Sequence, residues 1–177
     1  MLKRFFQGRP AKAAGRNLYV AAVDQARRPF LYTDLGVEDR IDARFELYVL
    51  HVTLLLERLK GHGEQAQEVS QAMFTEFVEA LDDALRELGV GDLAVAKKMR
   101  KLGEAVFGRI KAFDEAVAGE NPREALAGLV ARSVFNDAEA LERAGPLTDY
   151  LVDARARLAA QPLSDLIEAR PDWPRTA

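Results

Sequence analysis

Three long segments of this chain repeat apolar residues at the spacing of an α-helix, and this periodicity constrains the fold more than any other feature. In residues 40–60 the apolar positions recur in steps of three and four, which places them on one helix face. Residues 64–88 and 93–118 repeat the pattern. No segment alternates apolar and polar residues for long, and no Asn-Gly or Asp-Gly pair indicates a hairpin. The sequence therefore predicts an all-α fold.

Shorter sequence patterns predict further helices, which gives a bundle of about six to seven helices in all. An early helix is expected near residues 15–27, and a short helix is expected to begin at Pro122. A last helical region is expected at residues 137–160, where Gly145 and Pro146 predict a kink or a break into two pieces.

With 177 residues, the chain fits a single domain. We expect residues 1–14 to form a basic, flexible segment and residues 15–160 to form the helical domain. Residues 161–177 form a Pro-rich tail, which is either loose or fixed in place by Trp173.

Composition excludes several classes of function. The chain has no cysteine, which rules out disulfides, thiolate metal sites and cysteine nucleophiles. Its net charge of −3 does not indicate DNA binding. The longest uncharged apolar run, Leu47 to Leu56, is far shorter than the roughly 20 residues that span a bilayer. We therefore expect a cytoplasmic protein that does not span a membrane but can lie against one.

A glycine-rich turn joins the second and third long helical segments. Gly89 to Ala94 fits a loose G-x-G-x-x-A pattern, but a dinucleotide site requires a strand before the pattern, and here a helix precedes it. We instead predict that Gly89 ends one helix in a left-handed conformation and that Asp92 caps the next.

The residues needed for catalysis or metal binding do not occur at the required spacings. His51 and His62 lack the Glu-x-x-His spacing of di-iron bundles, and no serine lies in a nucleophile elbow. Asp82 and Asp83 resemble the magnesium-binding pair of all-α prenyl-transferring enzymes, but no second acidic cluster accompanies them. We therefore expect no enzyme, no metal and no cofactor; an isoprenoid diphosphate enzyme is an alternative.

Charge is distributed unevenly between two neighbouring segments. Residues 64–87 carry seven acids and one base, whereas residues 95–111 carry six bases and one acid. This pattern is typical of paired helices on a solvated bundle surface. It also fits a basic surface that binds anionic lipid or ribosomal RNA. The side chains expected to form that basic surface are Lys97, Lys98, Arg100 and Lys101.

The segment from Arg28 to Arg40 is too apolar for an ordinary solvated loop, and we expect it to cover or line a groove. In the helix that follows, Arg44, His51 and Arg58 are spaced by seven residues and form one stripe. This stripe is either the polar border of an amphipathic helix or a mixed cationic and apolar strip that binds a partner.

Four pieces of the sequence resemble the ubiquinol–cytochrome c chaperone family, the bacterial relatives of the mitochondrial assembly factor for cytochrome b. They are Leu18-Tyr19 with Ala26-Arg27; Phe30-Leu31-Tyr32 with Gly36-Val37; Arg44-Phe45-Glu46-Leu47 with His51 and Arg58-Leu59; and Leu85-Arg86-Glu87 with Gly89-Val90-Gly91-Asp92 through Gly108-Arg109. They cover about residues 17–115. The family usually has Gly where this chain has Ala43, which affects how closely a partner approaches the helix start.

The resemblance implies a non-enzymatic assembly chaperone that binds newly made cytochrome b and helps it join the quinol–cytochrome c reductase (bc1) complex. The mitochondrial member works with a small partner protein near the ribosome exit. Combined with the apolar loop and the mixed stripe, the resemblance predicts a client-binding surface made of Phe30, Tyr32, Val37, Arg44, Phe45, Tyr48 and His51. The alternative is a peripheral membrane or ribosome adaptor that uses the basic helix at residues 95–111.

Overall fold

The computed structural model describes residues 2–174, with the side chains of residues 2–9 and of Leu93 excluded. Within this range the chain forms six long helices and two short ones and no strand, which confirms the predicted all-α class. The helices are α1 (Leu2–Ala26), α2 (Phe30–Thr33), α3 (Ile41–Leu59), α4 (Glu64–Glu87), α5 (Asp92–Ala118), α6 (Pro122–Ser133), α7 (Leu141–Ala160) and α8 (Leu163–Ile167).

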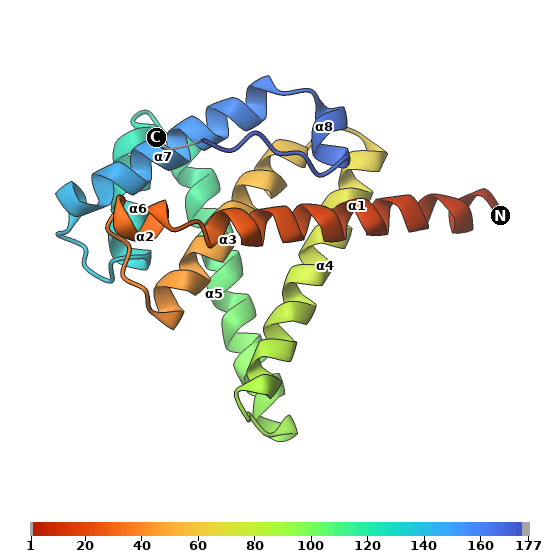
Figure 1. Cartoon of the computed structure of the whole chain (residues 1–177), viewed down its shortest axis with the longest axis horizontal. Helices are drawn as coiled ribbons and strands as arrows, with labels where there is room; N and C mark the ends of the chain where they lie inside the picture. Colours follow the sequence, from red (N-terminus) through yellow and green to blue (C-terminus); the bar gives the residue numbers. More distant parts are fainter. Residues whose placement is uncertain (1, 175–177) are drawn as a thin grey trace.

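Helix α3 is the centre of the fold. Its middle is buried on every side, from Val49 to Leu55, as expected for a helix that is surrounded by others. Helices α1, α4, α5 and α7 all pack against it. Figure 1 shows α4 and α5 meeting at a tip and separating toward the body of the molecule, so that the pair forms a projecting hairpin.

A glycine allows α1 to approach α4 closely. A Cβ atom placed on Gly15 would lie 2.5 Å from the Cβ of Ala72 and 2.6 Å from the backbone nitrogen of Met73. These distances are shorter than van der Waals contact, so no larger residue fits without separating the two helices. The crossing of α1 over α4 therefore depends on this one position.

The structure confirms one part of what was predicted for the turn between α4 and α5. Gly89 has a φ of 77°, and the Gly89 and Val90 N–H groups donate to the Arg86 and Leu85 carbonyls, which is the Schellman arrangement. The predicted cap at Asp92 is wrong. Asp92 is the first residue of α5, and its carboxylate accepts from Arg86 at 2.6 Å instead of capping the helix.

Two helices differ from expectation. Helix α1 begins at Leu2 and not near residue 15, so it continues across the predicted boundary at residue 14. Helix α7 is unbroken through Pro146. Because Pro146 is only the sixth helical residue, it removes one hydrogen bond near the start of the helix, and the buried residues that follow it hold the remaining turns.

The tail that follows α7 contains α8 and packs back onto the body. Leu166 of α8 is fully buried, and Trp173 lies against the core. The alternative in which the indole fixes the tail is therefore the one observed for residues 161–174. Residues 175–177 lie outside the described range.

Candidate protein-binding surface

Helix α2 and the start of α3 place an arginine against a tyrosine. The Arg44 guanidinium donates to both carboxylate oxygens of Asp39, at 2.5 and 2.9 Å, and these bonds lower the pKa of Asp39 below its ordinary value. The Arg44 Cζ atom lies 5.6 Å from the Tyr32 ring centroid. The Tyr32 hydroxyl donates to the Ala26 carbonyl at 2.9 Å, which fixes the ring. The result is a rigid aromatic surface with a cationic edge.

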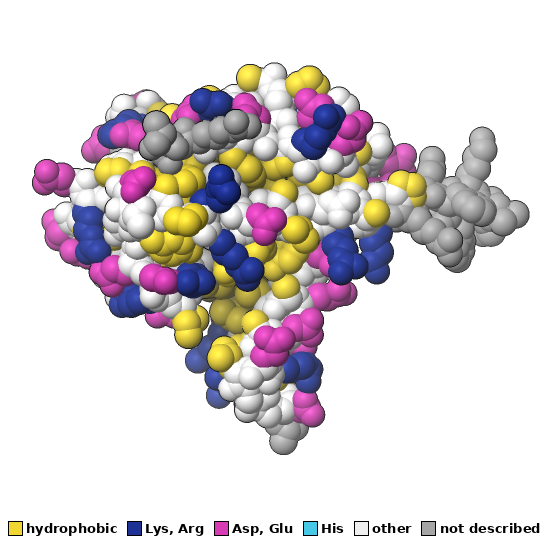
Figure 2. All heavy atoms as spheres, viewed as in Figure 1, with side chains coloured by type: hydrophobic (Ala, Val, Ile, Leu, Met, Phe, Trp, Pro, Cys, Tyr) yellow, Lys and Arg dark blue, Asp and Glu magenta, His cyan; other side chains and the backbone are white. Residues whose placement is uncertain are grey.

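A second arginine–tyrosine pair lies between α1 and α3. Arg27 donates from Nε to the Tyr48 hydroxyl at 2.9 Å, and its Cζ atom lies 5.6 Å from the Tyr48 ring centroid. Both tyrosine rings are half-buried. Figure 2 shows hydrophobic side chains gathered below α1 on the displayed face, with Lys and Arg side chains beside them.

Apolar groups complete this surface. Phe30 and Phe45 are half-buried, and the Phe30 ring packs edge-on against the Tyr150 ring at 5.6 Å between centroids. Ile41 is 73% exposed, which is unusual for a large aliphatic residue at the start of a helix. Sequence reasoning missed Ile41, although its position four residues before Phe45 places both on one face of α3.

Two of the seven predicted site residues lie in the core. Val37 is 3% exposed and His51 is 0% exposed, so the structure does not place them on the surface where the prediction expects a client. Val37 packs into the core after the apolar loop folds as α2, with the Val37 N–H donating to the Leu31 carbonyl. His51 lies on the side of α3 that faces α7 and not on an exposed stripe.

His51 is the centre of a buried polar network that joins three helices. The Tyr150 hydroxyl on α7 lies 2.8 Å from His51 Nε2 and accepts from Gln25 Nε2 of α1 at 3.0 Å. His51 Nδ1 lies 2.8 Å from the Leu47 carbonyl, which fixes a tautomer with its proton on Nδ1. Burial lowers the pKa of His51 to about 4, so the ring is neutral at pH 7.

The tail covers this network. The Trp173 ring packs edge-on against the His51 ring at 5.3 Å between centroids. The Trp173 indole nitrogen is buried and has no hydrogen-bond partner among the described residues. Trp173 therefore acts as an apolar cover over His51.

A partly buried ion pair connects α3 to α5. Arg109 donates from Nε and Nη2 to the two oxygens of Glu46 at 2.9 and 3.0 Å. Burial nevertheless raises the pKa of Glu46, because its side chain is only 9% exposed and the paired guanidinium offsets this only in part. The pair fixes the register of α5 beside the candidate surface.

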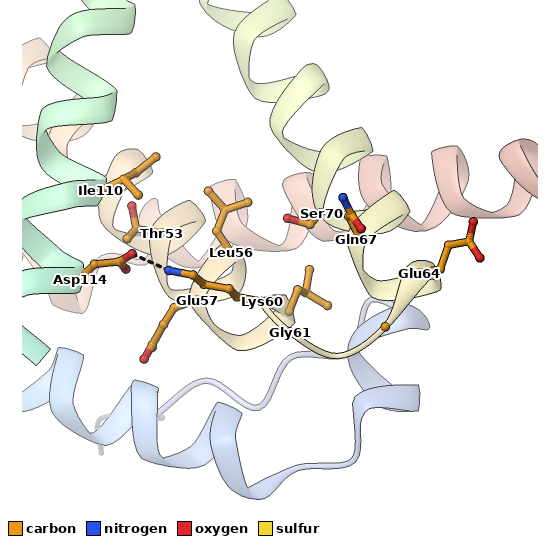
Figure 3. A pocket seen from close by; sticks show the side chains of 12 residues that line it. Thr53, Leu56, Glu57, Lys60, Gly61, Glu64, Gln67, Ser70, Ile110 and Asp114 are labelled. Carbon is orange, nitrogen blue, oxygen red and sulfur yellow. Dashed lines mark hydrogen bonds and ion pairs between the residues drawn. The ribbon is translucent and has the colours of Figure 1, made fainter. Parts of the chain in front are cut away.

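A pocket of about 820 Å³ lies between α3, α4 and α5 (Figure 3). Leu56 and Ile110 contribute apolar groups to its lining, and Gln67 and Ser70 on α4 contribute polar ones. Lys60 donates to Asp114 at 2.9 Å at its edge. The lining is mixed, and it also includes the carboxylates of Glu57 and Glu64.

The four predicted basic side chains lie together on the first half of α5. Lys97, Lys98, Arg100 and Lys101 are all exposed, and Arg100 forms a loose ion pair with Glu104 at 3.9 Å. Among the residues the structure describes, no helix is both long enough and apolar enough to cross a bilayer. The same residues contain no group of three or more His, Asp or Glu side chains placed to hold a metal ion.

Comparison with solved structures identifies the class of protein that has this fold. The crystal structure of the Cbp3 homolog from Brucella abortus matches with a TM-score of 0.84 and 29% sequence identity, over 99% of this chain and 97% of that one. No curated protein matches the chain.

Comparison of the sequence with family models identifies the family. The model of the family described as ubiquinol–cytochrome C chaperone matches residues 33–173, which is most of the chain. This protein belongs to the ubiquinol–cytochrome c chaperone family, as the four matching sequence pieces predicted. The match includes α3, the α4–α5 hairpin and Trp173.

Proposed function

We propose that this protein is an assembly chaperone that binds newly made cytochrome b and assists assembly of the quinol–cytochrome c reductase (bc1) complex without catalysing a reaction. Membership of the chaperone family supports the general role. The observation that supports the specific site is the pair of arginine–tyrosine contacts beside exposed apolar groups on α2 and α3. We place its action in the cytoplasm at the face of the inner membrane.

The chemistry of this surface suits a hydrophobic helix with polar ends. Ile41, Phe45 and the two tyrosine rings offer apolar contact, and a client helix could lie across them as amphipathic helices lie in grooves. Arg27 and Arg44 are already oriented by hydrogen bonds, so little side-chain entropy is lost when they meet a carbonyl or carboxylate of the client. The client-binding surface that we propose consists of Phe30, Tyr32, Ile41, Arg44, Phe45 and Tyr48.

Site-specific crosslinking tests this proposal. A photoreactive residue at Phe45 or Tyr32, in cells that synthesise cytochrome b, should yield an adduct that contains cytochrome b. Val152 is the matched control, because it is an exposed apolar residue on α7 (39% exposed) outside the proposed surface. Adducts from Val152 but none from Phe45 or Tyr32 would reject the surface while leaving the chaperone role intact.

A second function is supported by the exposed bases of α5. A peripheral adaptor would use Lys97, Lys98, Arg100 and Lys101 to hold the protein on an anionic membrane or on the ribosome, at about 1 kcal/mol per residue near a lipid surface. Reversing these four charges should abolish co-sedimentation with anionic vesicles or ribosomes. If the adaptor activity is the main one, client capture at Phe45 should also fail in cells; unchanged capture would favour the chaperone proposal.

A further inference from the structure

We propose that the α4–α5 hairpin is a self-association surface through which two copies of this chain form a symmetric dimer, the acidic helix α4 of each copy pairing with the basic helix α5 of the other. The partner is a second copy of the chain, and the proposal does not depend on the identity of the client.

The two helices carry opposite charges, and the ion pairs that these charges form lie mostly within one helix or with the body, as in Arg100–Glu104 and Arg109–Glu46, and not between the two helices. Residues 64–87 have seven acids against Arg86, and residues 95–111 have six bases against Glu104. Among the described residues, one ion pair joins the two helices, and it lies at the turn, where Arg86 meets Asp92 at 2.6 Å. Away from the turn the helices separate (Figure 1), and the charged side chains along them are exposed or half-exposed.

The charges form two stripes at helical spacing. Steps of three and four residues place side chains on one face of a helix. On α4 the acidic stripe carries Glu64, Glu68 and Asp82, with the uncharged Gln71, Thr75 and Val78 between them. On α5 the basic stripe carries Lys97, Arg100 and Lys111, with Glu104 and Phe107 between them. Every member of both stripes is exposed or half-exposed, so each stripe is available to an outside partner.

Both stripes also contain an exposed apolar group. Phe107 is 61% exposed and Val78 is 37% exposed. The Phe107 ring lies 5.7 Å from the ring of Phe74 on α4, so these groups form one patch that bridges the two helices. Ile110, one turn after Phe107, lines the 820 Å³ pocket, which extends the patch toward the body of the molecule. Contiguous exposed apolar groups with charged edges are typical of protein interfaces.

The distribution of charge favours a second copy over other occupants. A surface that carries an acidic stripe and a basic stripe side by side is complementary to itself when it is rotated by a two-fold axis. Each contact between α4 and α5 then occurs twice in the dimer. An anionic membrane would be repelled by the acidic stripe, and an apolar client helix would leave both stripes without partners.

Sedimentation velocity of the full chain tests the proposal. The wild-type protein should show a monomer–dimer equilibrium that weakens as salt is added, since exposed charges are screened within about 10 Å at 0.1 M salt. Phe107→Ser should weaken association by about ten-fold or more, because the residue lies at the centre of the patch. Leu141→Ser is the matched control, because Leu141 is 49% exposed but lies on α7, and it should leave association unchanged.

Charge reversal followed by mixing gives the decisive measurement. K97E/R100E/K111E makes both stripes acidic, and E64K/E68K/D82K makes both basic, so each variant alone should be monomeric. An equimolar mixture should regain the dimer as a heterodimer, because the stripes of one variant complement those of the other. R28E/R132E reverses two exposed bases outside the hairpin and should dimerise like the wild type.

Three results would overturn the proposal. The first is a wild-type chain that stays monomeric at high concentration and low salt. The second is a dimer that survives Phe107→Ser and both reversals, which would place the interface elsewhere. The third is a mixture of folded, reversed variants that stays monomeric. Circular dichroism of each variant establishes that it is folded, and client crosslinking from Phe45 reports on the proposed function separately.

Discussion

The body around α3 and the α4–α5 hairpin illustrate two different uses of the same helical periodicity. In the body, α3 is covered by other helices, and its polar groups are matched, with His51 bonded at both ring nitrogens. In the hairpin, large apolar groups remain exposed, with Leu88 at 68% and Phe107 at 61%. The middle of α3 uses its apolar residues for stability, whereas the hairpin, like the start of α3 at Ile41, keeps some of them available for contact with other molecules.

This difference predicts where substitutions affect folding and where they affect association. A buried residue loses many packing contacts when it is truncated, because protein interiors are close-packed. An exposed residue loses few contacts and changes stability little. Pairs of similar residues, one from each region, therefore test the comparison directly.

The largest effect is expected for two phenylalanines on the same helix. Phe113 is 0% exposed and Phe107 is 61% exposed, six residues apart on α5. Phe113→Ala should lower the free energy of unfolding by about 3–5 kcal/mol, because it leaves a cavity in the core. Phe107→Ala should cost about 1 kcal/mol or less. Urea unfolding at low protein concentration and high salt measures both on the monomer; equal costs would contradict the division of the molecule into these two regions.

The next effect concerns pH and is confined to the body. Burial lowers the pKa of His51 from 6.5 to about 4, so between these pH values the unfolded chain binds a proton at this site and the folded chain does not. Stability should therefore fall as the pH is lowered from 6.5, by up to about 3 kcal/mol at pH 4, and this loss should then level off.

Urea unfolding at a series of pH values measures this dependence. His51→Gln should reduce the slope of stability between pH 6.5 and pH 4. His62→Gln is the control, because His62 is exposed at the end of α3, and it should keep the wild-type slope. An unchanged slope in His51→Gln would show that other groups cause the acid sensitivity.

Substitution of two glycines by alanine separates the effect of helix packing on stability from the effect of helix propensity. Gly15→Ala should destabilise the fold by about 1–3 kcal/mol, because the new methyl group would overlap Ala72 where α1 crosses α4. Gly103→Ala lies within α5 with open space around it and should stabilise the helix by about 0.5–1 kcal/mol. Thermal unfolding of the two variants should shift in opposite directions; a stabilised Gly15→Ala would mean that α1 moves away from α4 at little cost.

The sequence was sufficient to predict the long central helices but not the two short ones, nor the way in which the helices pack. Periodicity located α3, α4 and α5, because an apolar stripe depends only on local spacing. Which helix packs against each apolar stripe depends on the tertiary structure. The interval of 99 residues between His51 and Tyr150 left no local signal that the two side chains form one network. The histidine therefore appeared to belong to an exposed stripe, although the structure places it in the core.

For a similar reason, only part of the candidate surface could be predicted from the sequence. The apolar loop and the arginines of α3 identified Tyr32, Arg44 and Phe45, which the structure leaves accessible. The loop was expected to cover or line a groove; the structure folds part of it as α2 and buries Leu31 and Val37 in the core. Which residues of a short apolar segment turn inward depends on the elements below them, and the sequence alone does not specify those elements.

The smallest predicted effect lies at the tip of the hairpin. Gly89 has a φ of 77°, a conformation that costs L-residues about 1 kcal/mol, so Gly89→Ala should destabilise the turn by about that amount. Gly91 has a φ of −65° and open space around it, and Gly91→Ala should change stability by about 0.5 kcal/mol or less. Amide hydrogen exchange locates the effect: protection should fall near the tip of α4 and α5 and stay unchanged in α3. Loss of protection in α3 as well would mean that hairpin and body unfold as one cooperative unit, and the hairpin could not then adjust to a partner independently of the core.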